Sequence, residues 1–235
     1  MNRIARAAGL LYLVVIVTGF FGLAYVPSQL IVHGDAAATV LRLAQSQTLF
    51  RLGIIADLAC NTAFLLLPLA LYRLLAPTGR TAALLMVALA AAGVPVAFAN
   101  TLHRVNVLSL LGHADYLAAF TADQLHAQVM LQLEAYRQGL LVLGVFWGAW
   151  LLPLGYLVFK SGFLPRPLGV LLVLGGLGYL ADVPASLLLP SYGASAVADY
   201  ATLPASLGEI GTCLWLLVMG ARLPAAPGRQ RPEIA

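Results

Sequence analysis

Long apolar runs constrain this chain more than any other feature of its sequence. A helix needs about 20 mainly apolar residues to cross the hydrocarbon core of a bilayer. Six segments meet this requirement, at approximately 9–26, 52–75, 81–102, 139–159, 167–189 and 204–222. Only 9% of the 235 residues are charged and 61% are hydrophobic, whereas a soluble domain carries roughly a quarter charged residues. The sequence therefore predicts an all-α polytopic membrane protein, with six transmembrane helices arranged as three hairpins.

The first apolar segment follows Arg3 and Arg6, as the apolar core of a signal peptide would. Its apolar run is too long for such a core, and no convincing small-x-small cleavage pattern follows it. We therefore interpret it as an uncleaved anchor. Residues 1–224 then form one transmembrane domain, and residues 225–235 form a short cytoplasmic tail.

Basic residues concentrate at the N-terminus, in the short connections after the second and fourth segments, and in the C-terminal tail. These regions hold nine of the 13 basic residues: Arg3, Arg6, Arg73, Arg80, Lys160, Arg166, Arg222, Arg229 and Arg231. Short basic loops remain in the cytoplasm, and of the nine acidic residues only Glu233 lies on this side. We therefore expect cytoplasmic termini, three longer connections facing outward, and a place in a bacterial cytoplasmic membrane. The net charge of +4 is then topogenic and does not indicate nucleic acid binding.

Two of the outward connections carry helical patterns. In the first, the apolar positions 37, 40, 41 and 44 share one helical face. In the second, Thr121 and Gln124 match the capping box, in which each residue's side chain bonds the other's backbone N–H. Both stretches predict amphipathic helices at the membrane surface or over the mouth of the bundle, and the second should lead into the fourth transmembrane helix.

Polar residues inside or next to the apolar segments gather at one depth, in the outer half of the predicted bundle. Asp57 and Asn61, four residues apart, share one helical face. The full set comes from five of the six segments: Asp57, Asn61, Asn100, His103, Arg104, Glu134, Arg137, Asp182 and Glu209. A charge facing lipid at a helix centre costs roughly 2.5–3.5 kcal/mol, so these residues should face the bundle interior. They predict an outward-facing polar cavity for a small polar or amphiphilic ligand, with Glu134 and Arg137 at its rim.

The polar layer leaves several functions open. Arg104 would contact an anionic group or act as a counter-ion, while the acids would bind a cation or move protons in acid/base chemistry. A transporter or sensor is an alternative, although the inner half of the bundle lacks a polar lining. A structural protein, in which buried ion pairs only fix the packing of the helices, is another. The predicted partners are the lipid bilayer and a lipid or small-molecule ligand, and no cofactor is indicated.

Other chemistries lack the residues they need. No two histidines have the H-x-x-x-H spacing of a metal site, and Cys60 and Cys213 form no spaced framework. No G-x-S-x-G elbow is present. The glycine run GGLGY (175–179) lies within a span, where glycines allow helices to pack closely, and the tryptophans at 147 and 150 indicate packing or anchoring at the interface.

Several stretches carry a family resemblance. They are ARAAGLLYLVVIVTG (5–19), LFRLGIIADL (49–58), SGFLPRPLGVLLVLGGLGYLADVPASLLLP (161–190) and GEIGTCLWLLVMG (208–220). Through them the chain resembles the uncharacterised bacterial integral-membrane family known as domain of unknown function 4386, over nearly its whole length. The resemblance implies a six-helix bacterial membrane protein. It implies no reaction and no catalytic residues.

Overall fold

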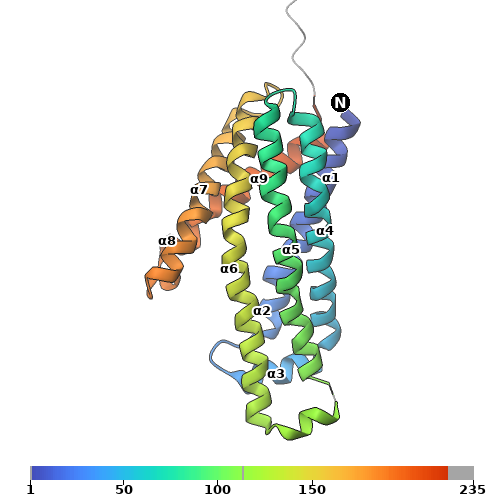
Figure 1. Cartoon of the computed structure of the whole chain (residues 1–235), viewed down its shortest axis with the longest axis vertical. Helices are drawn as coiled ribbons and strands as arrows, with labels where there is room; N and C mark the ends of the chain where they lie inside the picture. Colours follow the sequence, from blue (N-terminus) through green and yellow to red (C-terminus); the bar gives the residue numbers. More distant parts are fainter. Residues whose placement is uncertain (1, 113, 222–235) are drawn as a thin grey trace, which may run out of the picture.

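The computed structural model describes residues 2–112 and 114–221, and over these ranges the chain forms helices and turns without a β-strand (Figure 1). Six helical stretches are long and apolar enough to cross a membrane: Asn2–Leu30, Gln47–Leu75, Arg80–Leu110, Ala122–Lys160, Arg166–Leu188 and Ala196–Val218. The predicted all-α fold with six membrane-spanning helices is therefore confirmed. His113 and the predicted tail at 225–235 lie outside the described residues.

The first span consists of three consecutive helical pieces. They are α1 (Asn2–Gly19), the π-helical segment η1 (Phe20–Tyr25) and α2 (Val26–Leu30). The backbone N–H of Val26 bonds the carbonyl of Phe21, five residues earlier, and Pro27 has no N–H to donate. The carbonyl of Gly22 is therefore left without a helical donor, because neither Val26 nor Pro27 can supply one.

Short connections join the second to fifth spans in pairs. Residues 76–79 link α4 (Gln47–Leu75) to α5 (Arg80–Leu110), and residues 161–165 link α6 (Ala122–Lys160) to α7 (Arg166–Leu188). In the second connection Gly162 has a φ of 75°, a left-handed conformation that glycine adopts without steric cost. Both connections lie at the same end of the molecule as the N-terminus (Figure 1).

The opposite end holds two of the longer connections (Figure 1). In the first, α3 (Ala36–Gln45) begins after Asp35, whose carboxylate accepts the N–H of Ala38 at 2.8 Å. In the second, the 3₁₀ turn η2 (Asp115–Ala119) precedes α6, and both hydrogen bonds of the capping box form between Thr121 and Gln124. The helices predicted in these two connections are thus confirmed, and the second is continuous with the fourth span.

The third long connection, near the start of the last span, contains η3 (Tyr192–Ala194) and the short helix α8 (Ala196–Ala201). The final helix, α9 (Leu203–Val218), then packs against α7 and α1. Pro204 lies in its first turn, where the missing N–H costs nothing because a first-turn N–H has no helical acceptor.

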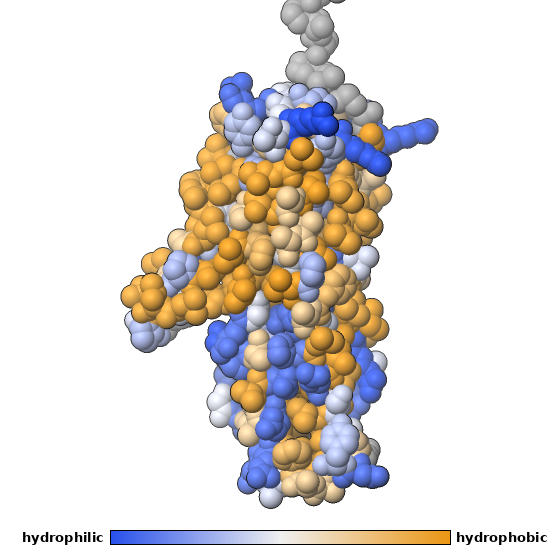
Figure 2. Space-filling view, viewed as in Figure 1, coloured by the Kyte–Doolittle hydropathy of each residue, from blue (hydrophilic) through white to orange (hydrophobic). Residues whose placement is uncertain are grey.

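Three helices are longer than a membrane requires. Their 29, 31 and 39 residues give α4, α5 and α6 lengths of about 44, 47 and 59 Å at 1.5 Å per residue. Since a hydrocarbon core is about 30 Å thick, these helices extend well beyond it. In Figure 2 polar side chains cap the end with the short connections, a mainly apolar band follows in that half of the molecule, and polar side chains gather again on the other half. The molecule therefore has a membrane part and a projecting part.

Glycines bring the helices of the membrane part into close contact. A Cβ at Gly176 of α7 would lie 2.8 Å from the carbonyl oxygen of Gly148 in α6, and a Cβ at Gly175 would overlap the backbone of Ala205 in α9. The glycine run therefore packs helices closely, as predicted. A separate apolar cluster around Leu30, Phe50 and Val129 occupies the projecting part.

Candidate functional site

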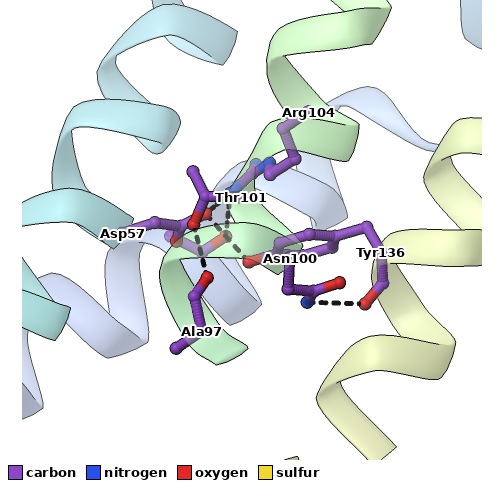
Figure 3. A network of polar contacts seen from close by, with 7 residues as sticks. Asp57, Ala97, Asn100, Thr101, Arg104 and Tyr136 are labelled. Carbon is purple, nitrogen blue, oxygen red and sulfur yellow. Dashed lines mark hydrogen bonds and ion pairs between the residues drawn. The ribbon is translucent and has the colours of Figure 1, made fainter. Parts of the chain in front are cut away.

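A buried ion pair joins two of the long helices. Nη1 of Arg104, on α5, donates to Oδ2 of Asp57, on α4, at 2.7 Å, and the two side chains are only 3% and 4% exposed. The hydroxyl of Tyr136, on α6, donates to the same carboxylate oxygen at 2.8 Å. Figure 3 shows these three side chains converging from their three helices.

The same arginine also holds the first span in place. Its Nη1 donates to the carbonyl oxygen of Gly22 at 3.2 Å, which is the carbonyl that η1 and Pro27 leave without a helical donor. A buried carbonyl without a partner would cost about 1–3 kcal/mol. Arg104 therefore removes this penalty and ties η1 to α4, α5 and α6.

Small residues make room for the network. A Cβ at Gly22 would overlap Oδ1 of Asp57, and a Cβ at Gly139 would overlap the side-chain amide of Asn100. That amide donates from Nδ2 to the backbone carbonyl of Tyr136 at 3.0 Å (Figure 3). Alanine at either glycine would thus displace a side chain of the network.

The guanidinium of Arg104 keeps part of its hydrogen-bonding capacity. Its Cζ lies 5.2 Å from the ring centroid of Phe50 and 5.1 Å from that of Tyr136, within the range of cation–π attraction. Both of its hydrogen bonds to described residues come from Nη1. Nε and Nη2 therefore make no hydrogen bond to these residues.

A cavity of about 560 Å³ lies in the projecting part of the molecule. Arg104 and Tyr136 line it together with Glu134, Arg137 and His33. The rest of its wall is mainly apolar and comes from α2, α3, α4 and α6, with Leu30, Leu43, Phe50, Met130 and Leu133 among its members. The volume falls within the range of about 300–1,000 Å³ that ligand pockets occupy.

Two further cavities lie within the bundle. One of about 210 Å³ is bounded by all six spans and includes Glu209, Asn61, Trp147 and Trp150 in its lining. A narrow space of about 30 Å³ lies next to it, beside Asp57, and shares lining residues with both larger cavities. The ion pair therefore stands between the central cavity and the cavity of the projecting part.

The structure separates the nine residues that the sequence placed in one layer. Asp57, Asn100 and Arg104 come together in the network, and Asn61 lines the central and the narrow cavity. Nδ1 of His103 is 2.9 Å from Oε1 of Gln132, away from the ion pair.

The other acids each have separate surroundings. Glu134 pairs with Arg137 three residues along α6 at 2.6 Å, and these side chains are 43% and 71% exposed. Glu209 accepts a hydrogen bond from the hydroxyl of Tyr12 at 2.9 Å. Asp182 lies on α7 outside the lining of all three cavities. The two arginines therefore neutralise only the first two acids of the predicted layer, Asp57 and Glu134.

Helix lengths give the depth of the network. On α4, 18 residues separate Asp57 from the helix end at Leu75, or about 27 Å along the axis. On α5, 24 residues separate Arg104 from Arg80, or about 36 Å. With a hydrocarbon core of about 30 Å that starts at the short connections, the network lies at the far boundary of the membrane. The larger cavity begins there.

No group of three or more His, Cys, Asp and Glu side chains within the described ranges is placed to hold a metal ion. The arrangement can instead offer guanidinium donors to an anionic group at the end of a largely apolar cavity.

Sequence reasoning missed Tyr136 and Gly22 as members of the network. Tyr136 follows Glu134 in a polar stretch. Nothing in the sequence there indicates that its side chain faces α4. For Gly22 a signal existed: Pro27 inside the first span removes a helical donor, and the carbonyl left over must find another partner.

Comparison with known proteins finds a family model that matches most of the chain. The family model described as "Domain of unknown function (DUF4386)" matches residues 7–220. An uncharacterized protein of Archaeoglobus fulgidus is 33% identical over 79 residues, which cover 34% of this chain and 44% of that protein. The chain thus spans less than half the length of this relative. No solved structure matches.

Proposed function

Since the chain belongs to the family described as "Domain of unknown function (DUF4386)", an integral membrane family without an assigned activity, we propose a function from the geometry of the site. The protein binds an amphiphile in the cavity of about 560 Å³. The anionic group of the ligand, a carboxylate or a phosphate, contacts Arg104, and its apolar portion lies along the wall formed by α2, α3 and α6.

The placement of Arg104 is the single observation that carries this proposal. The residue is 2% exposed, and the hydrogen bonds of Nη1 to Asp57 and to the carbonyl of Gly22 fix the guanidinium. The Nε and Nη2 edge then remains for a ligand, and a guanidinium edge matches carboxylate and phosphate oxygens in a bidentate way. Asp57 lies behind the arginine and orients it, since Asp57 itself does not line this cavity.

The apolar wall supports a ligand with a hydrocarbon part. Leu30 is 2% exposed and Leu43 is fully buried, yet both line the cavity with Met130 and Leu133. A soluble polar ligand would leave these side chains in contact with water inside the cavity. A hydrocarbon chain would release that water, at about 25 cal/mol for each Å² of apolar surface removed from it.

We further propose that the protein lies in a bacterial cytoplasmic membrane with its short basic connections inside. The cavity then opens on the outer side, where the ligand enters from the outer leaflet or the periplasm. Fusion of green fluorescent protein to the C-terminus tests this orientation, because the fusion becomes fluorescent only in the cytoplasm. A dark fusion protein that is inserted in the membrane would reverse the orientation.

Native mass spectrometry of the protein, purified in a nonionic detergent, tests the binding of the ligand. We expect a discrete adduct that extraction identifies as an anionic amphiphile. Arg104→Lys keeps a cation beside Asp57 but loses the guanidinium edge, so the adduct should decrease at least about tenfold, equivalent to about 1.4 kcal/mol of binding free energy. Leu133→Trp should remove the adduct by filling the cavity, and Arg51→Lys, at an exposed position on α4, is the matched control.

The alternative is a purely structural function. It is supported by the hydrogen bonds through which Asp57 and Arg104 connect α4, α5 and α6 with the carbonyl of Gly22. It predicts a wild-type protein without any adduct. It also predicts that Leu133→Trp changes nothing but stability. Equal adduct on the wild type, Arg104→Lys and Leu133→Trp would equally refute the proposed site.

A further inference from the structure

The central cavity of about 210 Å³ is not occupied by the proposed amphiphile, and its lining differs from that of the larger cavity. Helices α1, α4, α5, α6, α7 and α9 all line it, so it lies in the middle of the membrane part. Its wall holds one carboxylate, Glu209, and several aromatic side chains. No arginine, lysine or histidine from the described part of the chain belongs to this lining.

Among the described residues, Glu209 has a hydrogen-bond donor but no cationic partner. The hydroxyl of Tyr12 donates to Oε1 at 2.9 Å. The ion pairs within residues 2–112 and 114–221 join Asp57 to Arg104 and Glu134 to Arg137, so neither arginine neutralises this acid. The remaining carboxylate oxygen, Oε2, makes no hydrogen bond to a described residue.

The depth of Glu209 makes an unpaired charge unfavourable. Nine residues separate it from the end of α9 at Val218, so along the axis it lies at most about 14 Å from that end. This position is well inside a hydrocarbon core of about 30 Å. Ionisable groups at such depth pair with another charge or face a polar pathway, and a cationic ligand would supply the missing charge.

Aromatic side chains line the same cavity as the carboxylate. Trp147 and Tyr179 meet edge to face with centroids 6.1 Å apart, and Phe64 and Trp150 do so at 5.0 Å. All four side chains line the cavity. Aromatic faces attract cations through the ring quadrupole, and cages of such rings recognise quaternary ammonium groups. An inorganic cation would instead require about six to eight oxygen ligands, whereas the side-chain oxygens of this lining come from Tyr12, Asn61, Tyr179 and Glu209.

We propose that the central cavity binds a small organic cation of the alkylammonium class. Glu209 provides the counter-charge, Tyr12 orients the carboxylate, and the faces of Trp147, Trp150 and Tyr179 enclose the alkyl groups around the nitrogen. This site is separate from the amphiphile cavity beside Arg104, and either site can fail without the other.

A titration of the purified protein with choline tests the proposal, with quenching of tryptophan fluorescence as the readout. Two of the three tryptophans line the cavity, so saturable quenching is expected. The uncharged carbon counterpart of choline, 3,3-dimethylbutan-1-ol, should bind at least about tenfold more weakly because it lacks the positive charge.

Variants separate the charge from the fold. Glu209→Gln still accepts the hydrogen bond of Tyr12, and it should weaken choline binding about tenfold or more. Trp147→Leu should weaken choline binding about fivefold through the loss of one aromatic face. Asp182→Asn removes a carboxylate from α7 outside the cavity and should leave the affinity unchanged.

Three results would overturn the proposal. The wild type could bind choline and its uncharged counterpart with equal affinity, or Glu209→Gln could bind choline as tightly as the wild type does. The third result is that choline causes no saturable quenching in a folded wild-type preparation. The comparison of the two probes uses the wild type alone, so the proposal remains refutable if Glu209→Gln does not fold.

Discussion

Removal of one charge from the buried ion pair should cost more than removal of both. Asp57→Asn leaves Arg104 buried without a counter-ion. Arg104→Gln likewise leaves the carboxylate of Asp57 buried without one. Loss of one partner of a buried pair typically costs about 3–5 kcal/mol, whereas neutral replacements of both partners are often tolerated. We expect each single variant to lose about 3 kcal/mol of unfolding free energy.

The double variant Asp57→Asn/Arg104→Gln should be less destabilised than the two single variants together. Two amides can hydrogen-bond to each other and leave no buried charge. The stability will not return fully, because the carbonyl of Gly22 loses its donor at a cost of about 1–3 kcal/mol. These estimates predict a coupling energy of at least about 3 kcal/mol between Asp57 and Arg104.

Reversible unfolding in mixed micelles of nonionic detergent and dodecyl sulfate, followed by circular dichroism, measures the four free energies of this cycle. The same cycle on Glu134 and Arg137 is the matched control, since their side chains are 43% and 71% exposed. Exposed pairs contribute roughly 0.2–1 kcal/mol at most. Additive losses at Asp57 and Arg104, or equal coupling in both cycles, would refute the account of the network.

Three further changes test the packing and the helix ends. Gly22→Ala should destabilise the protein by about 1–3 kcal/mol, because the new Cβ overlaps a carboxylate oxygen. Gly193→Ala, whose new Cβ meets no atom within 4 Å, should leave the stability unchanged. Similar melting temperatures of the two variants would contradict this prediction. Thr121→Ala should cost about 1 kcal/mol and speed hydrogen exchange in the first turn of α6 only; unchanged exchange would mean that the capping box is dispensable. Glu134→Gln should change stability by less than about 1 kcal/mol, and a larger loss in thermal melts would show that its pair with Arg137 matters more than its exposure indicates.

Apolar length and periodicity were sufficient to predict most of the fold. The six spans follow from runs that only a bilayer could cover, and the start of α6 follows from the local pair Thr121 and Gln124. Local patterns did not predict that α4 would begin at Gln47 or that α5 would continue to Leu110, since these extensions are stabilised by packing in the projecting part. The π-helical turn at η1 was missed for a similar reason, although Pro27 signals an interruption there.

The candidate site was only partly predictable. Sequence placed Asp57 and Arg104 at similar depths on successive helices, but their contact depends on how α4 and α5 rotate against each other. Glu209 belongs to the same range of depth, yet α9 crosses the bundle between α7 and α1 and brings it to Tyr12. Depth can be counted along a helix from its sequence, whereas rotation and tilt depend on side chains of other helices.

The most direct test of the proposed function is a crystal structure of the protein purified in a nonionic detergent without added lipid. The account predicts elongated density along Leu43 and Met130, with its polar end within hydrogen-bonding distance of Nε and Nη2 of Arg104. Nη1 should remain bonded to Asp57 and to the carbonyl of Gly22. A cavity closed by side chains, with Nε and Nη2 of Arg104 bonded to protein groups, would contradict the account and leave the ion pair with a purely structural role.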